Sequence, residues 1–453
     1  MGSPSQSTVT LRDPVHGDIE LTREEVRLVD TPQFQRLRGV KQLGTTYLVF
    51  PGALHTRFEH SIGTLHMIDR LADAVNKNAR RSPDSCRGIN EEERRLLRFA
   101  ALLHDITHIP FGHNIEDQTG LLPRHDSPDR FEAVLGTGEL SEVLDELKIR
   151  DEMLSILAGR GEEMPAFMRQ ALSDTIDAAL LDYLRRDAYY TGLELRYDSR
   201  VADYFRIDRA TGEIFVDCEK EGMLREDIVS ELMRLLETRY HFSERVYYHH
   251  AKVAAGALLA RMVERAMVRG ALTADQLQES TDQSLLDYLG RVDLDDPQSN
   301  SRMRRFSNRF ARRKLPKRVL VLPYYLNRGV QEDLLGQYFT PGSPDARVAW
   351  EAAVEEEARA SLDRDIDVIM YCPARDMQLK EARTLVRMPE CRERTRPLSE
   401  FTEEIPRLGD LQESYLRLWR LYIFTSETEL DARRSLQSIC AAHLPGCVNA
   451  LRL

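Results

Sequence analysis

An adjacent histidine and aspartate at the end of an apolar segment place the strongest constraint on how this chain folds. Residues 94–103 have the pattern of an amphipathic helix, and His104 and Asp105 follow it directly, so we expect both side chains in the interior. Burying a carboxylate without a partner is costly. A divalent metal removes that cost, because neutral imidazole and carboxylate together suit such ions. The pattern does not distinguish Mn, Fe, Zn, Ni and Mg.

A single His-Asp pair is more often a core histidine beside a helix-ending aspartate. Here, however, four further histidines of the twelve in the chain lie at short separations in sequence: His60, His108, His113 and His125. This concentration favours a metal site. Such a site needs about four protein ligands, with positions left for water or substrate. We expect His60, His104 and Asp105 to supply three of them.

The fourth ligand is expected from a periodic helical segment, 176–190, which carries Asp177, Asp182 and Asp187. Asp177 and Asp182 are five residues apart, so they point about 140° away from each other on a helix. Only one of the two can face the metal, and we take Asp182 as the fourth ligand.

Histidines paired with carboxylates suit proton transfer near neutral pH. Glu116 lies three residues after His113, a spacing at which a helical carboxylate orients an imidazole, and Asp126 follows His125 directly. Candidate phosphate clamps, chosen because the guanidinium fork matches phosphate oxygens, are Arg57, Arg239 and Arg245. Each arginine by itself is more often a surface charge.

Charge and composition disfavour several classes of protein. The 453 residues include 63 Lys and Arg against 74 Asp and Glu, a formal net charge of −11, which disfavours a general nucleic-acid-coating role. Six scattered cysteines without CxxC spacing indicate reduced thiols. The first residues have no apolar core of a signal peptide, and no run approaches the roughly 18 apolar residues of a membrane span. We therefore expect a cytoplasmic protein with no membrane partner.

Hydrophobic periodicity predicts a mostly α fold with a smaller α+β C-terminal lobe. Residues 1–20 are expected to form an N-terminal arm with a short strand, and residues 21–290 one large helical body. Within this body we expect a helix over 57–74 and a β-type run over 45–50. The C-terminal lobe, 319–453, should contain strands at 319–322, 368–371 and 422–424 and helices at 349–362 and 429–442.

Residues 291–318 are expected to be a basic linker between the two parts. Nine of the seventeen residues from 302 to 318 are Lys or Arg. Such a tract is either a solvated helix face with a linker or a phosphate-contacting segment. Both interpretations stay open.

Several motifs in order carry a resemblance to a known family. They are Asp30 to Arg38 (DTPQFQRLR), Lys41 to Gly44 (KQLG), Val49 to Ala53 (VFPGA), Arg57 to Ser61 (RFEHS), His104 to His113 (HDITHIPFGH) and Asp182 to Asp187 (DYLRRD). Together they resemble the HD-domain deoxynucleotide triphosphohydrolases, with the greatest likeness to the HD region of the vertebrate SAM-and-HD-domain enzyme and its bacterial relatives. The likeness continues through 239–252 and more faintly into 418–440, and no SAM domain precedes it.

The resemblance implies an HD-domain helical fold over 21–290 and hydrolysis of a dNTP to deoxynucleoside and inorganic triphosphate. The metal would be held by His60, His104 and Asp105, and the proton transfers would fall to His113, helped by Glu116, and to His125. The family usually has Asp where Glu116 stands. Residues implied in binding the sugar, base or triphosphate are Gln42, Leu43, Arg57, His108, Tyr183, Asp187, Arg239 and Tyr247, with Tyr183 excluding a 2′-hydroxyl.

The resemblance also implies a regulatory nucleotide site. Asp30, Gln35 and Arg38 match the positions at which the family reads a guanine activator. They imply activation by GTP or a dNTP and a homo-oligomer, a dimer or tetramer, that buries nucleotide between subunits.

One departure from the family pattern concerns the metal. The family's fourth ligand lies three residues before the Asp-Tyr pair, and here that position is Ala179, with Leu180 after it. Either the site is weakened and the protein binds without turnover, or Asp177 or Asp182 substitutes, or Ala179 is an introduced replacement. Because the other catalytic positions are intact, an enzyme, active or deliberately inactivated, is favoured over a natural pseudoenzyme.

Two rivals belong to other functional classes. A nucleotide-sensing regulatory protein would keep Asp30, Gln35 and Arg38 without turnover, and Ala179 favours it. An HD phosphodiesterase or nuclease is favoured by the basic tract over 302–318. The acidic balance and the matched Gln42 and Tyr183 disfavour nucleic acid as a partner.

Overall fold

The computed structural model describes residues 8–119, 122–161, 164–173, 176–339, 344–373, 380–391 and 394–453. Helices dominate these residues, as the sequence predicted, and the strands form small sheets. The described part of the chain starts just before a hairpin of two antiparallel strands, β1 (Val9–Asp13) and β2 (Gly17–Leu21). This hairpin replaces the single short strand expected in the N-terminal arm.

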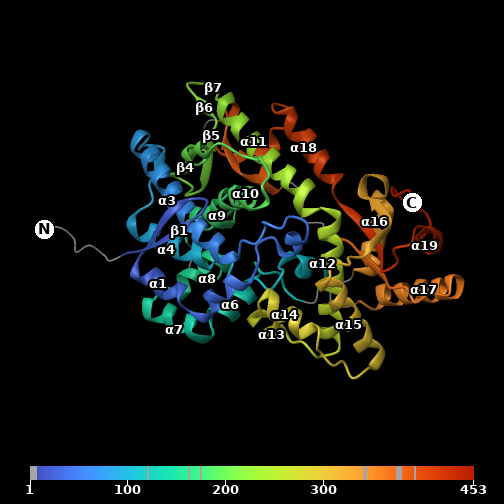
Figure 1. Ribbon diagram of the computed structural model, residues 1–453. Coiled ribbons are helices and arrows are strands. Elements are labelled where there is room, and N and C mark those ends of the chain that lie inside the picture. The colour runs from blue at the N-terminus through green and yellow to red at the C-terminus, as the bar shows by residue number, and fades with distance from the viewer. Residues whose placement is uncertain are drawn as a thin grey trace.

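A helical body follows the hairpin. Its elements are α1 (Arg23–Val29), α2 (Pro32–Gln35), η1 (Arg36–Gly39), η2 (Gly44–Leu48), α3 (Arg57–Arg81), α4 (Glu91–Leu103), α5 (His113–Thr119), α6 (Pro128–Leu135), α7 (Gly138–Leu147), α8 (Arg150–Ala158), α9 (Ala166–Ser173) and α10 (Ala178–Thr191). Figure 1 shows α3, α4 and α10 gathered at the centre of this body. The candidate site lies at the ends of these three helices.

Local sequence explains where α3 and α4 begin. Thr56 and Glu59 form a capping box at the start of α3, and Asn90 and Glu93 form one at the start of α4, so the first free N–H groups of both helices are bonded. The apolar face of α3 continues to Val75. The helix therefore runs seven residues beyond the expected end at residue 74.

The prediction of a β-type run over 45–50 is wrong. Residues Gly44–Leu48 form a 3-10 helix instead. Gly44 has a positive φ of 53°, a conformation that glycine adopts readily. The Asn114 side chain accepts a hydrogen bond from Thr45 N at 3.2 Å. A tertiary contact thus decides the conformation of this short segment over its β propensity.

Further along, the chain forms α11 (Glu226–Phe242), a π-helical turn η4 (Ser243–Tyr247), α12 (His250–Val268), α13 (Ala274–Glu279), α14 (Asp282–Leu289) and α15 (Pro297–Ala311). Helix α15 occupies much of the expected linker. Its apolar residues Met303, Phe306 and Phe310 are buried in the core beside α12. The segment is therefore a packed helix and not a linker.

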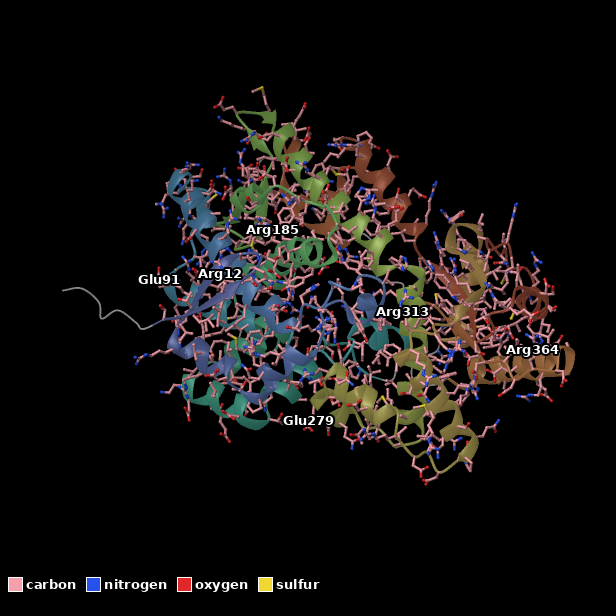
Figure 2. All side chains as sticks on the ribbon, in the orientation of Figure 1. Arg12, Glu91, Arg185, Glu279, Arg313 and Arg364 are labelled. Atoms are coloured by element: carbon pink, nitrogen blue, oxygen red, sulfur yellow. The ribbon has the colours of Figure 1, made fainter. Side chains whose placement is uncertain are left out.

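The basic residues of α15 are largely engaged in contacts. Arg302 pairs with Glu355 and Asp367, and Arg305 pairs with Asp367 at 2.6 Å. Beyond the helix, Arg313 donates to the Leu48 carbonyl at 2.5 Å; Figure 2 shows Arg313 at the junction of the two halves of the molecule. These contacts favour a structural role for the tract over a phosphate-contacting role.

The C-terminal lobe has a three-stranded antiparallel sheet in the order β8-β12-β9. Its elements are β8 (Lys317–Pro323), α16 (Arg328–Tyr338), α17 (Asp345–Leu362), β9 (Val368–Tyr371), β12 (Arg420–Thr425) and α19 (Leu430–Ala442). The three expected strands and two expected helices are confirmed. None of the helices in the described part of the chain is both long and apolar enough to cross a membrane.

Part of the expected C-terminal lobe returns to the first body. Strand β10 (Leu385–Arg387) pairs in parallel with β5 (Ile214–Asp217) in a five-stranded sheet that also contains β3 (Cys86–Arg87), β4 (Phe205–Asp208) and β11 (Arg396–Pro397). Helix α18 (Pro406–Leu416) lies beside α11 (Figure 1) and buries Leu408 and Leu411 in the first core. The expected single lobe over 319–453 is therefore divided between two cores.

Candidate active site

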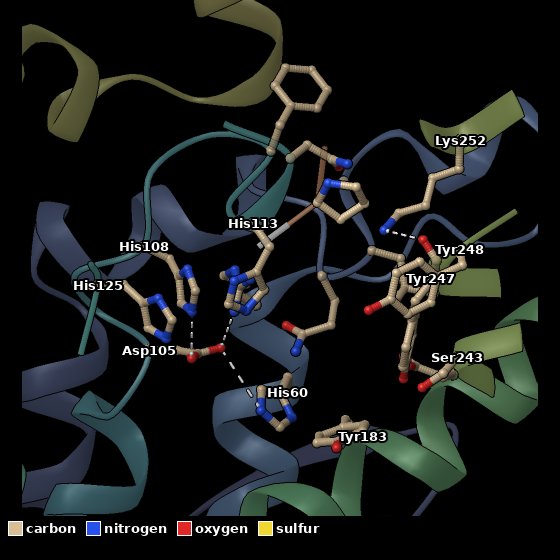
Figure 3. Close-up of a pocket in the computed structure, with 18 of the residues that line it drawn as sticks. His60, Asp105, His108, His113, His125, Tyr183, Ser243, Tyr247, Tyr248 and Lys252 are labelled. Atoms are coloured by element: carbon tan, nitrogen blue, oxygen red, sulfur yellow. Dashed lines mark hydrogen bonds and ion pairs between the residues drawn. The ribbon is translucent and has the colours of Figure 1, made fainter. Parts of the chain in front are cut away.

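Most of the residues expected in the metal and substrate site line one cavity of about 310 Å³. That volume suits a small-molecule ligand. Figure 3 shows side chains from distant segments pointing into it. Its lining includes Gln42, Leu43, Arg57, His60, His104, Asp105, His108, His113, His125, Ala179, Tyr183, Asp187, Arg239, Tyr247 and Lys252.

Three donors at the base of the cavity form the candidate metal site. One ligand atom from each of His60, His104 and Asp105 lies within 4.8 Å of the others. The two imidazole Nε2 atoms are 3.2 Å apart, and Asp105 oxygens lie 3.6 Å from His104 Nε2 and 3.8 Å from His60 Nε2. Metal–nitrogen bonds of about 2.1 Å at angles between square and tetrahedral leave neighbouring nitrogens about 3.0–3.4 Å apart. The donor set therefore fits a divalent ion.

Hydrogen bonds from the opposite ring nitrogens direct both Nε2 atoms toward this site. His104 Nδ1 donates to the Ala101 carbonyl at 2.7 Å. His60 Nδ1 donates to Asp182 Oδ2 at 2.7 Å. In each ring the proton on Nδ1 leaves Nε2 with a lone pair, which is how proteins prepare a histidine for a metal. Burial lowers the pKa of His104, which keeps it neutral.

The structure places neither flanking aspartate among the donors. Asp182 is completely buried behind His60, where it bonds the ring nitrogen remote from the cluster. Asp177 is the N-cap of α10 and accepts from Leu180 N at 2.7 Å. Ala179 lines the cavity but its methyl group cannot ligate a metal. The geometry therefore does not support Asp182 as the fourth ligand: within the described residues, the cluster offers three candidate ligands.

A second group of three imidazoles, His108, His113 and His125, lies beside the metal donors. The rings of His108 and His125 are stacked with centroids 3.7 Å apart. His113 is solvent-exposed and faces both rings edge-on. Burial lowers the pKa of His108 and of His125. His108 and His125 therefore offer neutral imidazoles next to the candidate metal site.

Glu116 bonds His125 in this structure. His125 Nδ1 donates to Glu116 Oε2 at 2.9 Å, and Arg130 donates to the other carboxylate oxygen at 2.8 Å. The sequence spacing paired Glu116 with His113, and the two groups also interact electrostatically. The Thr107 hydroxyl donates to the His125 carbonyl at 2.6 Å and so holds His125 where its ring meets the Glu116 carboxylate, a contact that helical spacing does not reveal.

The residues expected to contact a sugar or phosphate line the opposite wall of the cavity. Asp187 accepts from Tyr247 Oη at 2.7 Å and from His55 Nε2 at 2.9 Å. Tyr183, Arg239 and Tyr247 lie together there. Burial raises the pKa of both tyrosines, so both hydroxyls stay protonated as hydrogen-bond donors. Arg245 is exposed and does not belong to the lining.

Sequence reasoning missed several lining residues. Tyr371 ends β9, Tyr415 lies on α18 and Asn114 lies on α5. His55, which bonds Asp187, was also missed. Tyr371 and Tyr415 reach the cavity only because the C-terminal segments fold back onto the first body. Their sequence surroundings contain no motif that could have revealed this.

The three expected activator residues lie away from the cavity, around α2. Asp30 borders a surface groove with Arg27, Glu139, Glu142 and Glu146. Arg38 donates to Gln35 Oε1 at 2.9 Å and covers the Phe58 ring at 3.5 Å. Between them Arg36 points inward and donates to the carbonyls of Ile106 and His108 at 3.1 and 2.8 Å. This segment therefore touches the loop that carries the site.

Comparison with known proteins identifies the class to which this fold and site belong. An HD domain matches residues 57–187, which contain the metal donors, and an HD-associated region matches residues 215–438. The chain therefore contains an HD domain followed by an HD-associated region.

Among its relatives is the human deoxynucleoside triphosphate triphosphohydrolase SAMHD1, 28% identical over 65% of this chain and 49% of the relative. An uncharacterized protein of Bacillus subtilis, YwfO, is 33% identical over 56% of this chain and 55% of its own length. The chain spans about half the length of the curated relatives it matches. A crystal structure of a hypothetical protein from Aquifex aeolicus shares the fold, with a TM-score of 0.65 over 95% of this chain and all of that one at 23% identity.

Proposed function

We propose that this protein hydrolyses deoxynucleoside triphosphates to deoxynucleosides and inorganic triphosphate. The observation that carries the proposal is one cavity in which the donor set His60, His104 and Asp105 adjoins the imidazole group His108, His113 and His125. The relationship to deoxynucleoside triphosphate triphosphohydrolases supports this choice of substrate.

A divalent metal at His60, His104 and Asp105 supplies positive charge that stabilises a phosphoryl transition state. The cavity also contains Arg57, Arg239 and Lys252, whose cations suit a triphosphate. These side chains bind and orient the substrate, while the tyrosines of the opposite wall pack on the sugar. With Tyr183 under the ribose, a 2′-hydroxyl would be excluded, and Gln42 and Leu43 would contact the sugar and base.

Proton transfers fall to two imidazoles. A water molecule attacks the α-phosphorus, the bond to the 5′ oxygen breaks, and the triphosphate leaves the nucleoside. His125, kept neutral by burial and oriented by Glu116, accepts the proton of the attacking water. His113, at the exposed side of the group, donates a proton to the 5′ oxygen. His108 contacts the phosphate between them.

The test is product analysis with each dNTP and Mn²⁺, with and without GTP or a second dNTP as activator, and with ribonucleotides as a control. The expected result is release of deoxynucleoside and triphosphate in equal amounts. His125→Asn and Glu116→Gln should lower the rate by at least about a hundredfold, because general acid–base catalysis contributes factors of about 10²–10⁴. Release of monophosphate and diphosphate would contradict the proposed reaction.

A second candidate function is a nucleotide sensor without turnover. Ala179 favours it, because no carboxylate completes the donor set within the described residues. Tight dNTP binding without any product would support this candidate. We also propose that nucleotide at Asp30, Gln35 and Arg38 promotes a homo-oligomer, which sedimentation with and without GTP would test.

A further inference from the structure

The N-terminal hairpin places two buried polar side chains directly behind the metal donors. Asp13 and His16 lie at the turn between β1 and β2. The side chain of Asp13 is 5% exposed and that of His16 is 1% exposed. Polar side chains this deeply buried need partners, and both find them on α10.

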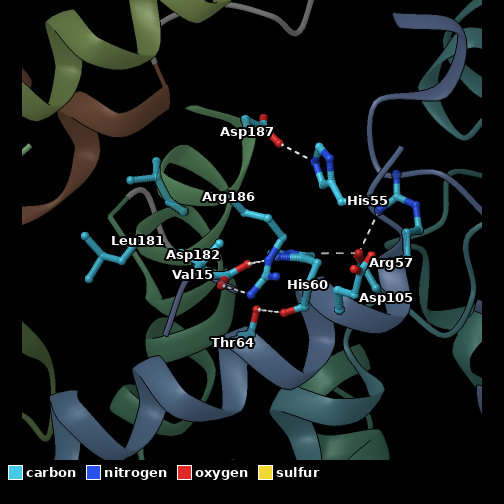
Figure 4. A network of polar contacts seen from close by, with 12 residues as sticks. Val15, His55, Arg57, His60, Thr64, Asp105, Leu181, Asp182, Arg186 and Asp187 are labelled. Atoms are coloured by element: carbon cyan, nitrogen blue, oxygen red, sulfur yellow. Dashed lines mark hydrogen bonds and ion pairs between the residues drawn. The ribbon is translucent and has the colours of Figure 1, made fainter. Parts of the chain in front are cut away.

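One carboxylate joins the hairpin to the metal site. Asp182 accepts from His16 Nε2 at 2.6 Å on one oxygen and from His60 Nδ1 at 2.7 Å on the other. Arg186 donates to both oxygens of the same carboxylate at 2.8 and 2.9 Å. Figure 4 shows Asp182 and Arg186 facing His60 in this network. Asp182 is therefore held from three directions.

Asp13 closes the network into a ring. Its Oδ2 accepts from Arg186 Nη1 at 2.7 Å, and its Oδ1 accepts from the backbone N–H groups of Val15 and His16 at 2.9 and 2.8 Å. The same carboxylate thus shapes the turn and anchors it to α10. A fully bonded buried network of this kind admits one arrangement.

Gly63 of α3 makes room for the ring. A Cβ at this position would lie 2.0 Å from Asp182 Oδ1 and 2.2 Å from Arg186 Nη2. Glycine in a helix interior costs about 1 kcal/mol relative to alanine. Its presence in the helix that carries His60 is explained by the close approach of this ion pair.

We propose that His16 is a positioning residue for the metal centre. Through Asp182 it holds the His60 ring with Nε2 directed toward the metal, so that docking of the hairpin 9–21 and metal binding stabilise each other. This inference rests on the metal centre of the proposed function but not on the identity of its substrate. The competing explanation is simple packing, because the His16 ring also stacks on His66 with centroids 4.7 Å apart.

Two substitutions separate positioning from packing. His16→Gln keeps an N–H that can reach Asp182, whereas His16→Leu keeps volume and removes the donor. Affinity for Mn²⁺ is measured by competition with a chelator. Removal of a hydrogen-bond partner behind a metal ligand typically weakens metal binding by about 10–100-fold, and we expect His16→Leu to weaken Mn²⁺ binding by this factor. His16→Gln keeps the hydrogen bond, so its Mn²⁺ affinity should stay within about threefold of wild type.

The matched control is Arg12→Ala on the same hairpin. Figure 2 labels Arg12, whose side chain is 77% exposed and pairs with Asp18 at the surface. Its removal should leave Mn²⁺ affinity unchanged. Equal Mn²⁺ affinity of wild type and His16→Leu would overturn the proposal.

Hydrogen exchange gives an independent readout, and its comparison on the wild-type protein needs no variant to fold. Mn²⁺ should slow exchange of the hairpin amides, 9–21, relative to protein in EDTA, and the slowing should be lost in His16→Leu. Hairpin exchange that is unaffected by bound Mn²⁺ would overturn the proposed coupling. If Mn²⁺ binds with the expected pattern but no dNTP is hydrolysed, only the proposed reaction fails; if the wild type binds no Mn²⁺, the proposed metal centre and this inference both fail.

Discussion

Arg57, at the start of α3, donates a 2.7 Å hydrogen bond to Asp105, which lies just beyond the end of α4. Their side chains are 3% and 8% exposed. Burial by itself would raise the pKa of Asp105, but the Arg57 guanidinium and the adjoining imidazoles outweigh it, so the pKa lies well below its usual value. Arg57 thus keeps a candidate metal ligand ionised while also lining the cavity.

Replacing Arg57 should destabilise the metal-free protein more than the metal-loaded one. Arg57→Leu leaves Asp105 buried without its cation, and removing one partner of a buried pair costs about 3–5 kcal/mol. A bound divalent ion would supply the missing charge. Urea unfolding in EDTA and in Mn²⁺ checks this. An equal loss of unfolding free energy under both conditions would contradict it.

Gly63→Ala should destabilise the protein, although alanine normally favours helices. The new methyl group would collide with Asp182 and Arg186, and overpacking of this kind costs about 1–3 kcal/mol. The control is Gly409→Ala in α18, where a Cβ meets nothing within 4 Å and should stabilise by roughly 0.5–1 kcal/mol. Thermal unfolding of both variants measures the difference, and a stabilised Gly63→Ala protein would refute the close approach.

Arg36→Ala should loosen the loop that carries the site histidines. Arg36 donates to the carbonyls of Ile106, His108 and Ser280, and burial lowers its pKa only to about 10, so it remains charged. Hydrogen exchange over 106–113 should accelerate. Arg38→Ala, two residues along, leaves these bonds intact and should not change exchange there. Identical exchange in the two variants would argue against this link.

Ala179→Asp should strengthen metal binding, because it adds a carboxylate to a cavity wall that borders three donors. We expect at least about a tenfold gain, the scale on which single groups at metal sites act. Ala179→Asn is the neutral control of the same size. Elemental analysis after dialysis and chelator competition measure the effect, and equal metal content of all three proteins would rule it out.

His66 should make stability sensitive to acid. Burial, and then His16, lowers its pKa from 6.5 to about 4. Because the folded-state pKa is the lower one, the unfolded chain binds an extra proton between these values, and stability falls as pH drops from 6.5 toward 4. His66→Gln cannot take up that proton. Between pH 6.5 and 4 the Tm of His66→Gln should therefore decline less steeply than that of the wild type, while above pH 7 the two Tm values should change in parallel. Parallel changes over the whole range would contradict the lowered pKa of His66.

Much of the helical architecture could be predicted from the sequence, because periodicity and capping act locally. The start of α3 at Arg57 was predicted from its own residues, and the β9 strand from 368 to 371 matches the structure residue for residue. The prediction of a β-type run over 45–50 was wrong because a contact with Asn114 outweighs the β propensity of this segment. The prediction of a linker over 291–318 was wrong because the apolar residues of α15 are interspersed with arginines. These arginines find acidic partners only in the folded chain.

The candidate site, too, could be predicted only in part from the sequence. The histidines and Asp105 of the motifs were recognisable, and those predicted as metal donors or acid–base groups line one cavity, while their catalytic and ligand roles stay predictions. The position of Asp182 behind His60 depends on Arg186 and on the hairpin, neither of which its helical spacing reveals. The pairing of Glu116 with His125 depends on the position of the loop that carries His125, which Thr107 holds by its hydrogen bond to the His125 carbonyl.

The sequence by itself determined the likeness to HD-domain proteins, the helical class and most of the polar residues that line the cavity, because these depend on residue type and short-range spacing. Only the tertiary structure decided which carboxylate faces which imidazole, and that the hairpin and the C-terminal segments complete the centre. The physical reason is that a buried charge takes its role from partners far along the chain, and their distances are set by packing rather than by spacing in sequence.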